Sequence, residues 1–300
     1  MRNVLLIFLD GVGIGEEDFE NNPFYKYPFK TFSSIFNNIP NKNNPILINN
    51  DKYLFPTDAL LGIEGLPQSG TGQTSIFCGV NAQQIVGKHF GPFPYSTLLP
   101  VIENDNIFNC LIKKNKKAAF ANAFPQIFFD YINEGKRRLS VSSLSCLYSG
   151  IPLFTFNDLL NGNALSAEID NFRWVTKLNY NLPIIEPEKA AQRLLYLTEQ
   201  NNFVLFEYFY SDHLGHGRLT DNFQNILKTL DDFLYYILSN YNNNTTVIIC
   251  SDHGNLEDLS IKTHTLNPCL TIAAGKNSDI AFKQIKDISQ IKQFICGELC

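Results

Sequence analysis

The stretch VLLIFLDGVG, residues 4–13, decides the fold. Six apolar residues run without interruption into Asp10 and a glycine-rich turn. A short apolar run that ends in such a turn is typical of a buried strand. In an open α/β sheet, the loops at the carboxyl ends of the strands carry the functional side chains. Residues 4–9 are therefore predicted to form a strand that delivers the carboxylate of Asp10 to one edge of a sheet.

Two later segments repeat this pattern. Residues 203–210, FVLFEYFY, lead into Asp212, and residues 245–250, TTVIIC, lead into Asp252. Because parallel strands end at the same edge of a sheet, three strands of this kind are expected to bring three carboxylates together.

The rest of the chain alternates short apolar runs with longer amphipathic stretches. Further strands are predicted at 117–122 and 269–275. Helices are predicted at 187–200, where Pro187 suits the first turn, and at 221–241, whose apolar residues recur at helical spacing. The alternation predicts an α/β fold with a doubly wound, largely parallel sheet flanked by helices.

The domain organisation follows from length and pattern. With 300 residues, of which 44% are hydrophobic, the chain is long enough to bury a substantial core. We expect residues 1–300 to form one domain. Residues 23–53, rich in Asn, Pro and Phe, are expected to cross the sheet irregularly, and residues 130–181 are expected to form a small cap insertion beside the site.

Charge and hydropathy exclude several classes of function. The net charge is −5, and the only sizeable basic run is at residues 113–117, so no nucleic-acid surface is expected. The first apolar run is too short for a signal peptide or a membrane span, which predicts a cytoplasmic protein without membrane contact. The seven cysteines form no CxxC pair and are expected to be reduced thiols. The oligomeric state is not indicated.

Four of the five histidines fall into three short motifs in the last third of the chain. These are SDHLGH at 211–216, SDHGN at 251–255 and THTLNP at 263–268. Aspartate and histidine are the ligands that borderline divalent metals prefer. Together with Asp10, the three motifs predict a metal site where the strands end.

A glycine-rich segment precedes the cap. Residues 65–81, GLPQSGTGQTSIFCGVN, combine glycines, hydroxyl side chains and an apolar run that can begin a helix. Such a segment can aim backbone N–H groups and the positive end of a helix at an anion. Ser and Thr beside Gly are also ordinary turn and N-cap residues, so a phosphate site and a simple helix start are both compatible with this segment.

In their order and spacing, these motifs resemble those of the alkaline phosphatase superfamily. They are most similar to its cofactor-independent phosphoglycerate mutase and phosphopentomutase branch, the metalloenzyme domain. The resemblance covers residues 1–95 and 200–280 and rests on Asp10-Gly11, the loop 65–74, Asp212 with His216, residues 252–255, and His264-Thr265 with Asn267-Pro268. It implies a doubly wound α/β core that holds two divalent ions bridged by the attacking hydroxyl.

The resemblance also implies a role for individual residues. One ion would be held by Asp10, Asp252, His253 and the hydroxyl of Thr74, and the other by Asp212, His216 and His264. Thr74 is predicted to be the nucleophile because Gly72-Gln73-Thr74 aligns with the family's hydroxyl motif, with Ser69, Thr71 and Ser75 as alternatives. A mixed nitrogen and oxygen ligand set favours manganese or zinc.

These assignments predict a metal-dependent phosphoryl-transfer enzyme, most simply a phosphate-ester hydrolase with a phospho-Thr74 intermediate and a small-molecule substrate. A metal and a helix N-terminus both favour the alkoxide that attacks phosphorus. The interval between Thr74 and Asp212 is too short for the large clamp domain of the mutases, and Arg137 and Arg138 are the predicted anion-binding residues. A phosphoglycerate or phosphopentose mutase with a shortened cap is the alternative, and a non-catalytic metal-binding protein is the alternative of another class. Phosphate monoesters, phosphate diesters and sulfate esters all remain open as substrates.

Overall fold

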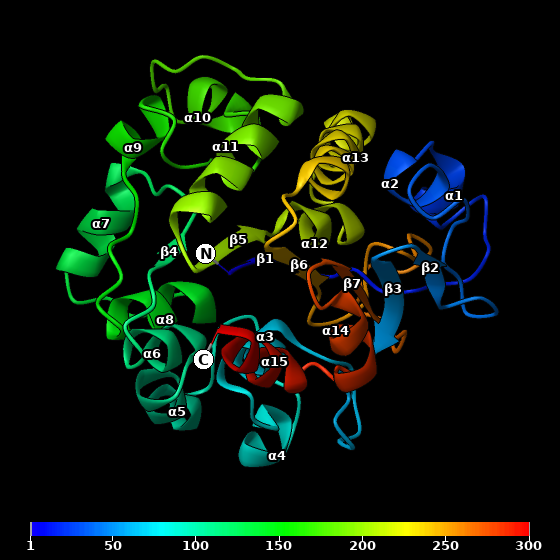
Figure 1. The fold of residues 1–300 in the computed structure, drawn as a ribbon, viewed down its shortest axis with the longest axis horizontal. Coiled ribbons are helices and arrows are strands. Elements are labelled where there is room, and N and C mark those ends of the chain that lie inside the picture. The colour runs from blue at the N-terminus through cyan, green and yellow to red at the C-terminus, as the bar shows by residue number, and fades with distance from the viewer. Residues whose placement is uncertain (1, 300) are drawn as a thin grey trace.

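The chain folds around a seven-stranded mixed sheet, seen here in a computed structural model that describes residues 2–299 (Figure 1). The strand order is β2-β3-β7-β6-β1-β5-β4. The strands are β1 (Asn3–Leu9), β2 (Leu47–Asn49), β3 (Lys52–Thr57), β4 (Ala118–Phe120), β5 (Phe203–Tyr208), β6 (Thr245–Cys250) and β7 (Cys269–Gly275). All five predicted strands are present, as β1, β4, β5, β6 and β7.

The sheet is parallel on one side and antiparallel on the other. The neighbours β4, β5, β1 and β6 pair in parallel, which confirms the predicted doubly wound arrangement in this half. By contrast, β7 pairs antiparallel with both β6 and β3, and β2 pairs antiparallel with β3. The chain passes from β6 to β7 through the loop 251–268 without a crossover helix, and a direct connection of this kind allows an antiparallel neighbour.

Two layers of helices cover the two faces of the sheet (Figure 1). Leu5 and Ile7 of β1 face one layer, whereas Leu6 and Phe8 face the other, because successive strand residues point to opposite faces. The first layer contains α1 (Pro23–Lys26), α2 (Lys30–Ser33), α11 (Pro187–Gln200) and α13 (Phe223–Asn240). The second contains α3 (Ser69–Cys78), α4 (Ala82–Val86), α5 (Leu99–Asn104), α6 (Ile107–Ile112), α8 (Val141–Tyr148), α14 (Ser278–Gln284) and α15 (Gln290–Leu299). Both predicted helices are present, as α11 and α13.

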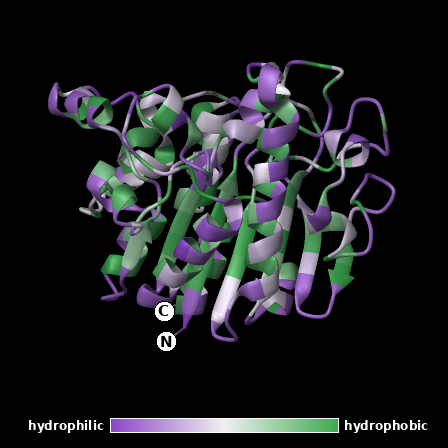
Figure 2. Cartoon of the chain, turned by 90° about the horizontal axis from the view of Figure 1, so that it is seen from above, coloured by the Kyte–Doolittle hydropathy of each residue, from purple (hydrophilic) through white to green (hydrophobic). Residues whose placement is uncertain are grey.

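The hydropathy of the chain follows these layers. Figure 2 shows the strands as a largely hydrophobic band, while hydrophilic residues colour parts of the surrounding helices and many connecting loops. A strand covered on both faces needs a nearly continuous apolar sequence, which explains the run at residues 4–9. Among the helices between residues 2 and 299, none combines the length and the apolar character required to cross a membrane.

The segment 23–53 is more regular than its composition predicts. It contains α1, α2 and β2, and the rings of Phe24, Phe29 and Phe32 pack on one another with centroids 4.8 to 5.2 Å apart. The carboxylate of Asp231 on α13 accepts hydrogen bonds from the backbone N–H groups of Lys30 and Thr31. This aromatic cluster and the link to α13 order the segment against the first helix layer.

The stretch 130–181 does not form one unit of its own. Helix α8 lies within it, yet Val141 and Leu144 belong to the same apolar cluster as α3. A separate small cluster contains Ala123, Leu159, Ala164, Trp174 and Leu182. The helices outside the two layers are α7 (Gln126–Asn133), α9 (Phe156–Leu160), α10 (Phe172–Thr176) and α12 (Tyr210–Gly215), with 3₁₀ turns at Ser96–Leu98 and Thr220–Asn222. The predicted cap boundary is therefore wrong at its N-terminal side, because residues 141–148 are part of the main core.

Candidate metal centre

The predicted acidic ligands meet where β5, β1 and β6 end. Asp10 directly follows β1, and a single residue separates Asp252 from the end of β6. Asp212 lies in α12, which begins shortly after β5. These three strands are adjacent and parallel, so their carboxyl ends lie at one edge of the sheet.

One group of ligands surrounds the imidazole of His253. Its Nε2 atom lies 3.2 Å from Oδ1 of Asp10 and 3.6 Å from Oδ2 of Asp252. His253 and Asp252 are fully buried, and Asp10 is nearly so. One ligand atom from each of these three residues fits within a span of 4.8 Å, which is compatible with coordination of a single ion.

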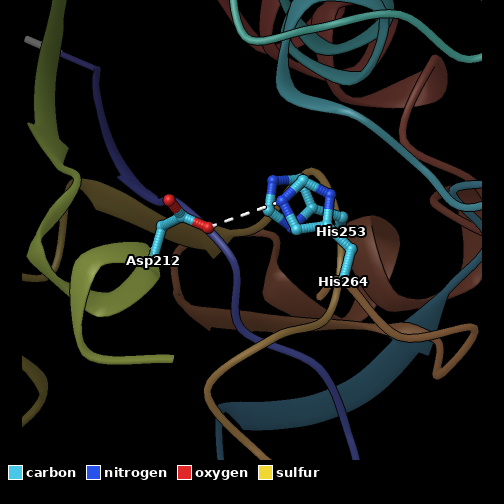
Figure 3. A group of neighbouring side chains, drawn as sticks. All are labelled: Asp212, His253 and His264. Carbon is cyan, nitrogen blue, oxygen red and sulfur yellow. Dashed lines mark ion pairs between the residues drawn. The ribbon is translucent and has the colours of Figure 1, made fainter. Parts of the chain in front are cut away.

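A second group lies directly beside the first. It consists of Asp212, His253 and His264, whose ligand atoms again lie within 4.8 Å of one another (Figure 3). The rings of His253 and His264 stack with centroids 3.7 Å apart. His216 approaches the same carboxylate, with Nε2 3.1 Å from Oδ1 of Asp212. The structure therefore brings all six predicted Asp and His ligands into two adjoining groups, with His253 between them.

Backbone carbonyls orient two of the histidines. Nδ1 of His216 donates to the carbonyl of Lys262 at 2.7 Å, and Nδ1 of His264 donates to that of Pro67 at 2.6 Å. A proton held on Nδ1 leaves the Nε2 lone pair free to bind a metal. The bond to Pro67 also ties the glycine-rich loop to the site.

Two further residues support the ligands, and neither was predicted. Asn255 donates from Nδ2 to Oδ1 of Asp212 at 2.8 Å. The buried carboxylate of Glu257 accepts hydrogen bonds from the N–H groups of Gly13 and Asn255 and from the side chains of Thr265 and Asn267. Glu257 thus ties the loop after β1 to the loop 251–268 and links the two ends of the latter. Asn255 belongs to the SDHGN motif and was open to prediction, whereas no sequence pattern marks Glu257.

The electrostatics of the cluster fit a cation. Oδ1 of Asp10 and Oδ2 of Asp252 are buried, and no donor among residues 2–299 forms a hydrogen bond with either oxygen. Although burial alone lowers the pKa of His253, the charges of Asp252 and Asp10 raise it to about 10. A proton on His253 therefore offsets the carboxylate charge, and a divalent cation would replace that proton on binding.

The hydroxyl of Ser69 lies against the imidazole of His253. Ser69 is the first residue of helix α3, and its Oγ atom lies 3.1 Å from Nε2 of His253. Thr74, five residues further along the same helix, is fully buried, and its hydroxyl donates to the carbonyl of Gly70 at 2.7 Å. The prediction of Thr74 as nucleophile and metal ligand does not fit this geometry, because the helix register turns its side chain away from the site.

The other hydroxyls of α3 are also engaged elsewhere. Thr71 donates to the carbonyl of Gln68, and Ser75 bonds with the side chain of Gln83. Gly72 allows the helix to approach the cluster, because a Cβ atom there would lie 2.8 Å from Cβ of Asp252. Of the four hydroxyl residues considered from the sequence, Ser69 is the one that the structure places at the metal centre.

The remaining histidines lie outside both groups. His213 packs against the rings of Phe209 and Tyr210, and burial lowers its pKa. His89 donates from Nε2 to the carbonyl of Ile63 at 3.0 Å, in agreement with a structural role.

Comparison with known proteins agrees with this geometry. Residues 177–299, which include five of the six Asp and His ligands, match the model of the Metalloenzyme superfamily. The match covers the C-terminal part of the chain only. The predicted resemblance is thereby confirmed, and with it a metal-dependent enzyme as the class of protein. No curated protein sequence matches the chain.

Solved structures show the same fold across the whole chain. Alkaline phosphatase from the Antarctic bacterium TAB5 is 14% identical, with 99% of this chain and 98% of that chain covered and a TM-score of 0.56. The PH0037 protein from Pyrococcus horikoshii is also 14% identical, with 99% and 96% covered and a TM-score of 0.55. Phosphoglycerate mutase from Leishmania mexicana is 9% identical, with 99% and 95% covered and a TM-score of 0.50. The chain thus has the alkaline phosphatase-like fold that its motifs predict.

The metalloenzyme site opens into a cavity of about 590 Å³. Asp10, Ser69 and Asp212 line its inner end, together with Gln73, whose buried Oε1 has no hydrogen-bond partner among the described residues. Gln73 was not predicted. It stands four residues after Ser69, on the same helix.

A buried carboxyl group lies in the cavity wall. Glu207 on β5 accepts a hydrogen bond from the hydroxyl of Ser142 at 2.6 Å. Burial raises its pKa to about 7, and the nearby charge of Asp10 acts in the same direction. Nothing in the apolar run of β5 distinguishes Glu207 as part of a site rather than as an interruption of the strand.

Proposed function

We propose that this chain is a two-metal-dependent phosphate-ester hydrolase that acts through a phospho-Ser69 intermediate. The observation that carries the proposal is that two ligand groups meet at His253, whose Nε2 atom lies 3.1 Å from the hydroxyl of Ser69, with His216 beside Asp212. Ser69 replaces Thr74 in the role derived from the sequence. An adjacent pair of ligand groups with an open cavity suits catalysis better than a closed structural site does.

Two sets of residues would hold the ions. Asp10, Asp252 and His253 form the first set, and Asp212, His216 and His264 form the second. Bound manganese or zinc would favour the ionised serine hydroxyl and would neutralise charge on the transferred phosphoryl group.

The chain's own residues supply position and orientation. Ser69 Oγ attacks phosphorus while the bond from phosphorus to the ester oxygen breaks and the alcohol leaves. Because Ser69 lies in the first turn of α3, the positive end of the helix favours negative charge there. Water then cleaves the phosphoserine, which releases phosphate and restores the hydroxyl. His216 and His264 stay aligned throughout because backbone carbonyls hold their Nδ1 protons.

The geometry favours hydrolysis over intramolecular transfer. A mutase must retain its dephosphorylated substrate while phosphate returns to a second oxygen. Here, the short helix α10 lines the cavity, and its Trp174 belongs to a small apolar cluster. Arg137, one of the two predicted anion-binding residues, donates to the carbonyls of Ile132 and Lys136 instead. Arg138 lines the cavity.

The test is a metal-dependent activity screen. The purified chain is stripped with a chelator, reloaded with manganese or zinc, and assayed with a phosphate monoester, a phosphate diester and a sulfate ester. We expect hydrolysis of the monoester only after reloading, and we expect Asp252→Asn to lower the metal content measured by elemental analysis. Activity that survives complete removal of metal contradicts the proposal. Return of phosphate to a sugar acceptor, rather than to water, establishes the mutase alternative.

A further inference from the structure

The cavity beside the metal centre is much larger than a phosphate group requires. Its volume of about 590 Å³ lies in the range typical of sites for small organic molecules. Aromatic side chains form much of its wall, namely Phe93, Phe124, Phe128, Tyr131, Trp174, Phe209 and Tyr210. Burying a polar group against such a wall costs free energy unless the group has a hydrogen-bond partner. The wall therefore suits an apolar organic group.

Four basic side chains also line this cavity. They are Arg138, Arg173, Lys177 and Arg218. None of the four forms an ion pair with a carboxylate of the described residues. Their positive charges are therefore available to a ligand.

Aromatic rings position two of these guanidinium groups. Arg138 lies 4.9 Å from the ring centroid of Phe93, and Arg173 lies 5.4 Å from that of Tyr210. Stacking on a ring orients a guanidinium plane and leaves its charge uncompensated. The carboxylate of Glu168, which also lines the cavity, accepts hydrogen bonds from the N–H groups of Arg173 and Trp174 rather than pairing with a guanidinium.

The basic side chains extend away from the metal centre. A second cavity, of about 610 Å³, adjoins the first and shares Glu168, Arg173, Lys177, Tyr210 and Arg218 with it, and Asp170 and Asp221 line its outer part. This second cavity is not lined by any of the six metal ligands or by Ser69. The basic side chains of Arg173, Lys177 and Arg218 thus lie between the cavity beside the metal ligands and the second cavity. There they can bind an anion other than the reacting phosphoryl group.

We infer that the substrate is a phosphate ester whose organic group has a bulky apolar part and carries a second negative charge. The inference rests on the proposed hydrolase function and deepens it. The reacting phosphoryl group binds at Ser69 and the metals, the apolar part lies against the aromatic wall, and the second anion lies at Arg173 and its basic neighbours.

Three substrates with similar leaving alcohols test the inference: ethyl phosphate, 2-phenylethyl phosphate and 2-(4-carboxyphenyl)ethyl phosphate. With the metal-loaded protein, kcat/KM is expected to rise about tenfold for the phenyl ring and about tenfold again for the carboxylate. Equal kcat/KM for all three overturns the inference and leaves the hydrolase proposal intact.

Matched variants test whether the basic residues cause the second rise in kcat/KM, the one expected for the carboxylate. Arg173→Met combined with Arg218→Met should remove the preference for the carboxylated substrate, so that kcat/KM falls about tenfold more for that substrate than for 2-phenylethyl phosphate. Arg137→Met is the control, because its guanidinium bonds to backbone carbonyls outside the cavity and should change neither value. A preference that persists in the double variant contradicts the assigned anion site.

Binding gives a readout that does not depend on turnover. Calorimetry with metal-loaded Ser69→Ala should give the same order of Kd for the three esters, with the carboxylated ester binding most tightly. If that order holds but the unmodified protein hydrolyses none of the esters, the proposed reaction is wrong and the ligand class stands. If the three Kd values are equal, the ligand class is wrong.

Discussion

The first turn of α3 and its later turns have similar sequences and different surroundings. Ser69, in the first turn, faces the ligand cluster at 3.1 Å from His253. Thr74 and Ser75, further along, are buried and bonded within the core. A serine or threonine hydroxyl that donates to a carbonyl of its own helix is not available for attack. The position in the helix, rather than the residue type, therefore decides which hydroxyl can react.

The most direct way to break this comparison is to remove each hydroxyl in turn. Ser69→Ala should lower kcat for a phosphate monoester by about 10³-fold or more, because the attacking oxygen is lost. Thr74→Val should leave kcat within about threefold. Steady-state kinetics on metal-loaded proteins with equal metal content decides between them. Activity lost in Thr74→Val and kept in Ser69→Ala would restore the assignment made from the sequence.

Glu207 extends the comparison to a buried carboxyl group near the cavity. Its pKa is raised from 4.5 to about 7, so its contribution to stability is complete below pH 4.5 and is lost as the pH rises through 7. Glu207→Gln should therefore abolish a fall of about 3 kcal/mol in the free energy of unfolding between these pH values. The measurement is the difference between the unmodified protein and the variant in denaturant unfolding at each pH. A pH-independent difference contradicts the raised pKa.

A methyl group tests how closely α3 must approach the cluster. In Gly72→Ala, the added Cβ would lie 2.8 Å from Cβ and 2.9 Å from the carbonyl oxygen of Asp252. We expect metal affinity to fall about tenfold, as it does when the support of a ligand is disturbed. Gly297→Ala is the control, because Gly297 lies in α15 and its Cβ would meet no atom within 4 Å. Competition with a chromophoric chelator gives both affinities, and equal values contradict a tight contact.

The smallest expected effect is on the free energy of unfolding, where the hydroxyls of Thr74 and Ser69 can again be compared. Thr74→Val removes a buried hydroxyl that donates to the carbonyl of Gly70 and should lower the free energy of unfolding by about 1 kcal/mol. Ser69→Ala should change it by less than that, because the partner of the Ser69 hydroxyl is the imidazole of His253 rather than a backbone group of α3. Unfolding in denaturant, with both proteins free of metal, measures the two values. A larger loss for Ser69→Ala would mean that Ser69 also supports the helix.

Much of the fold was predictable because its signals are local. The run at 4–9 is apolar throughout and the run at 245–250 is apolar after its two threonines, as strands covered on both faces require, and helices 187–200 and 223–240 have one apolar face. The antiparallel half of the sheet was not predicted, since the direction of β7 depends on how the loop 251–268 returns to the sheet. No local pattern encodes that path.

The sequence by itself determined which side chains are available as metal ligands, because each lies in a short motif, and those of Asp10, Asp212 and Asp252 follow closely on the end of a strand. The tertiary structure decided which hydroxyl faces them. That choice depends on contacts between distant segments, such as the bond from His264 to Pro67 and the approach of Gly72 to Asp252. The cavity likewise combines side chains from separate parts of the chain, among them Arg138, Arg173 and Glu207. Spacing along the chain reports local geometry, whereas these positions are set by packing between elements.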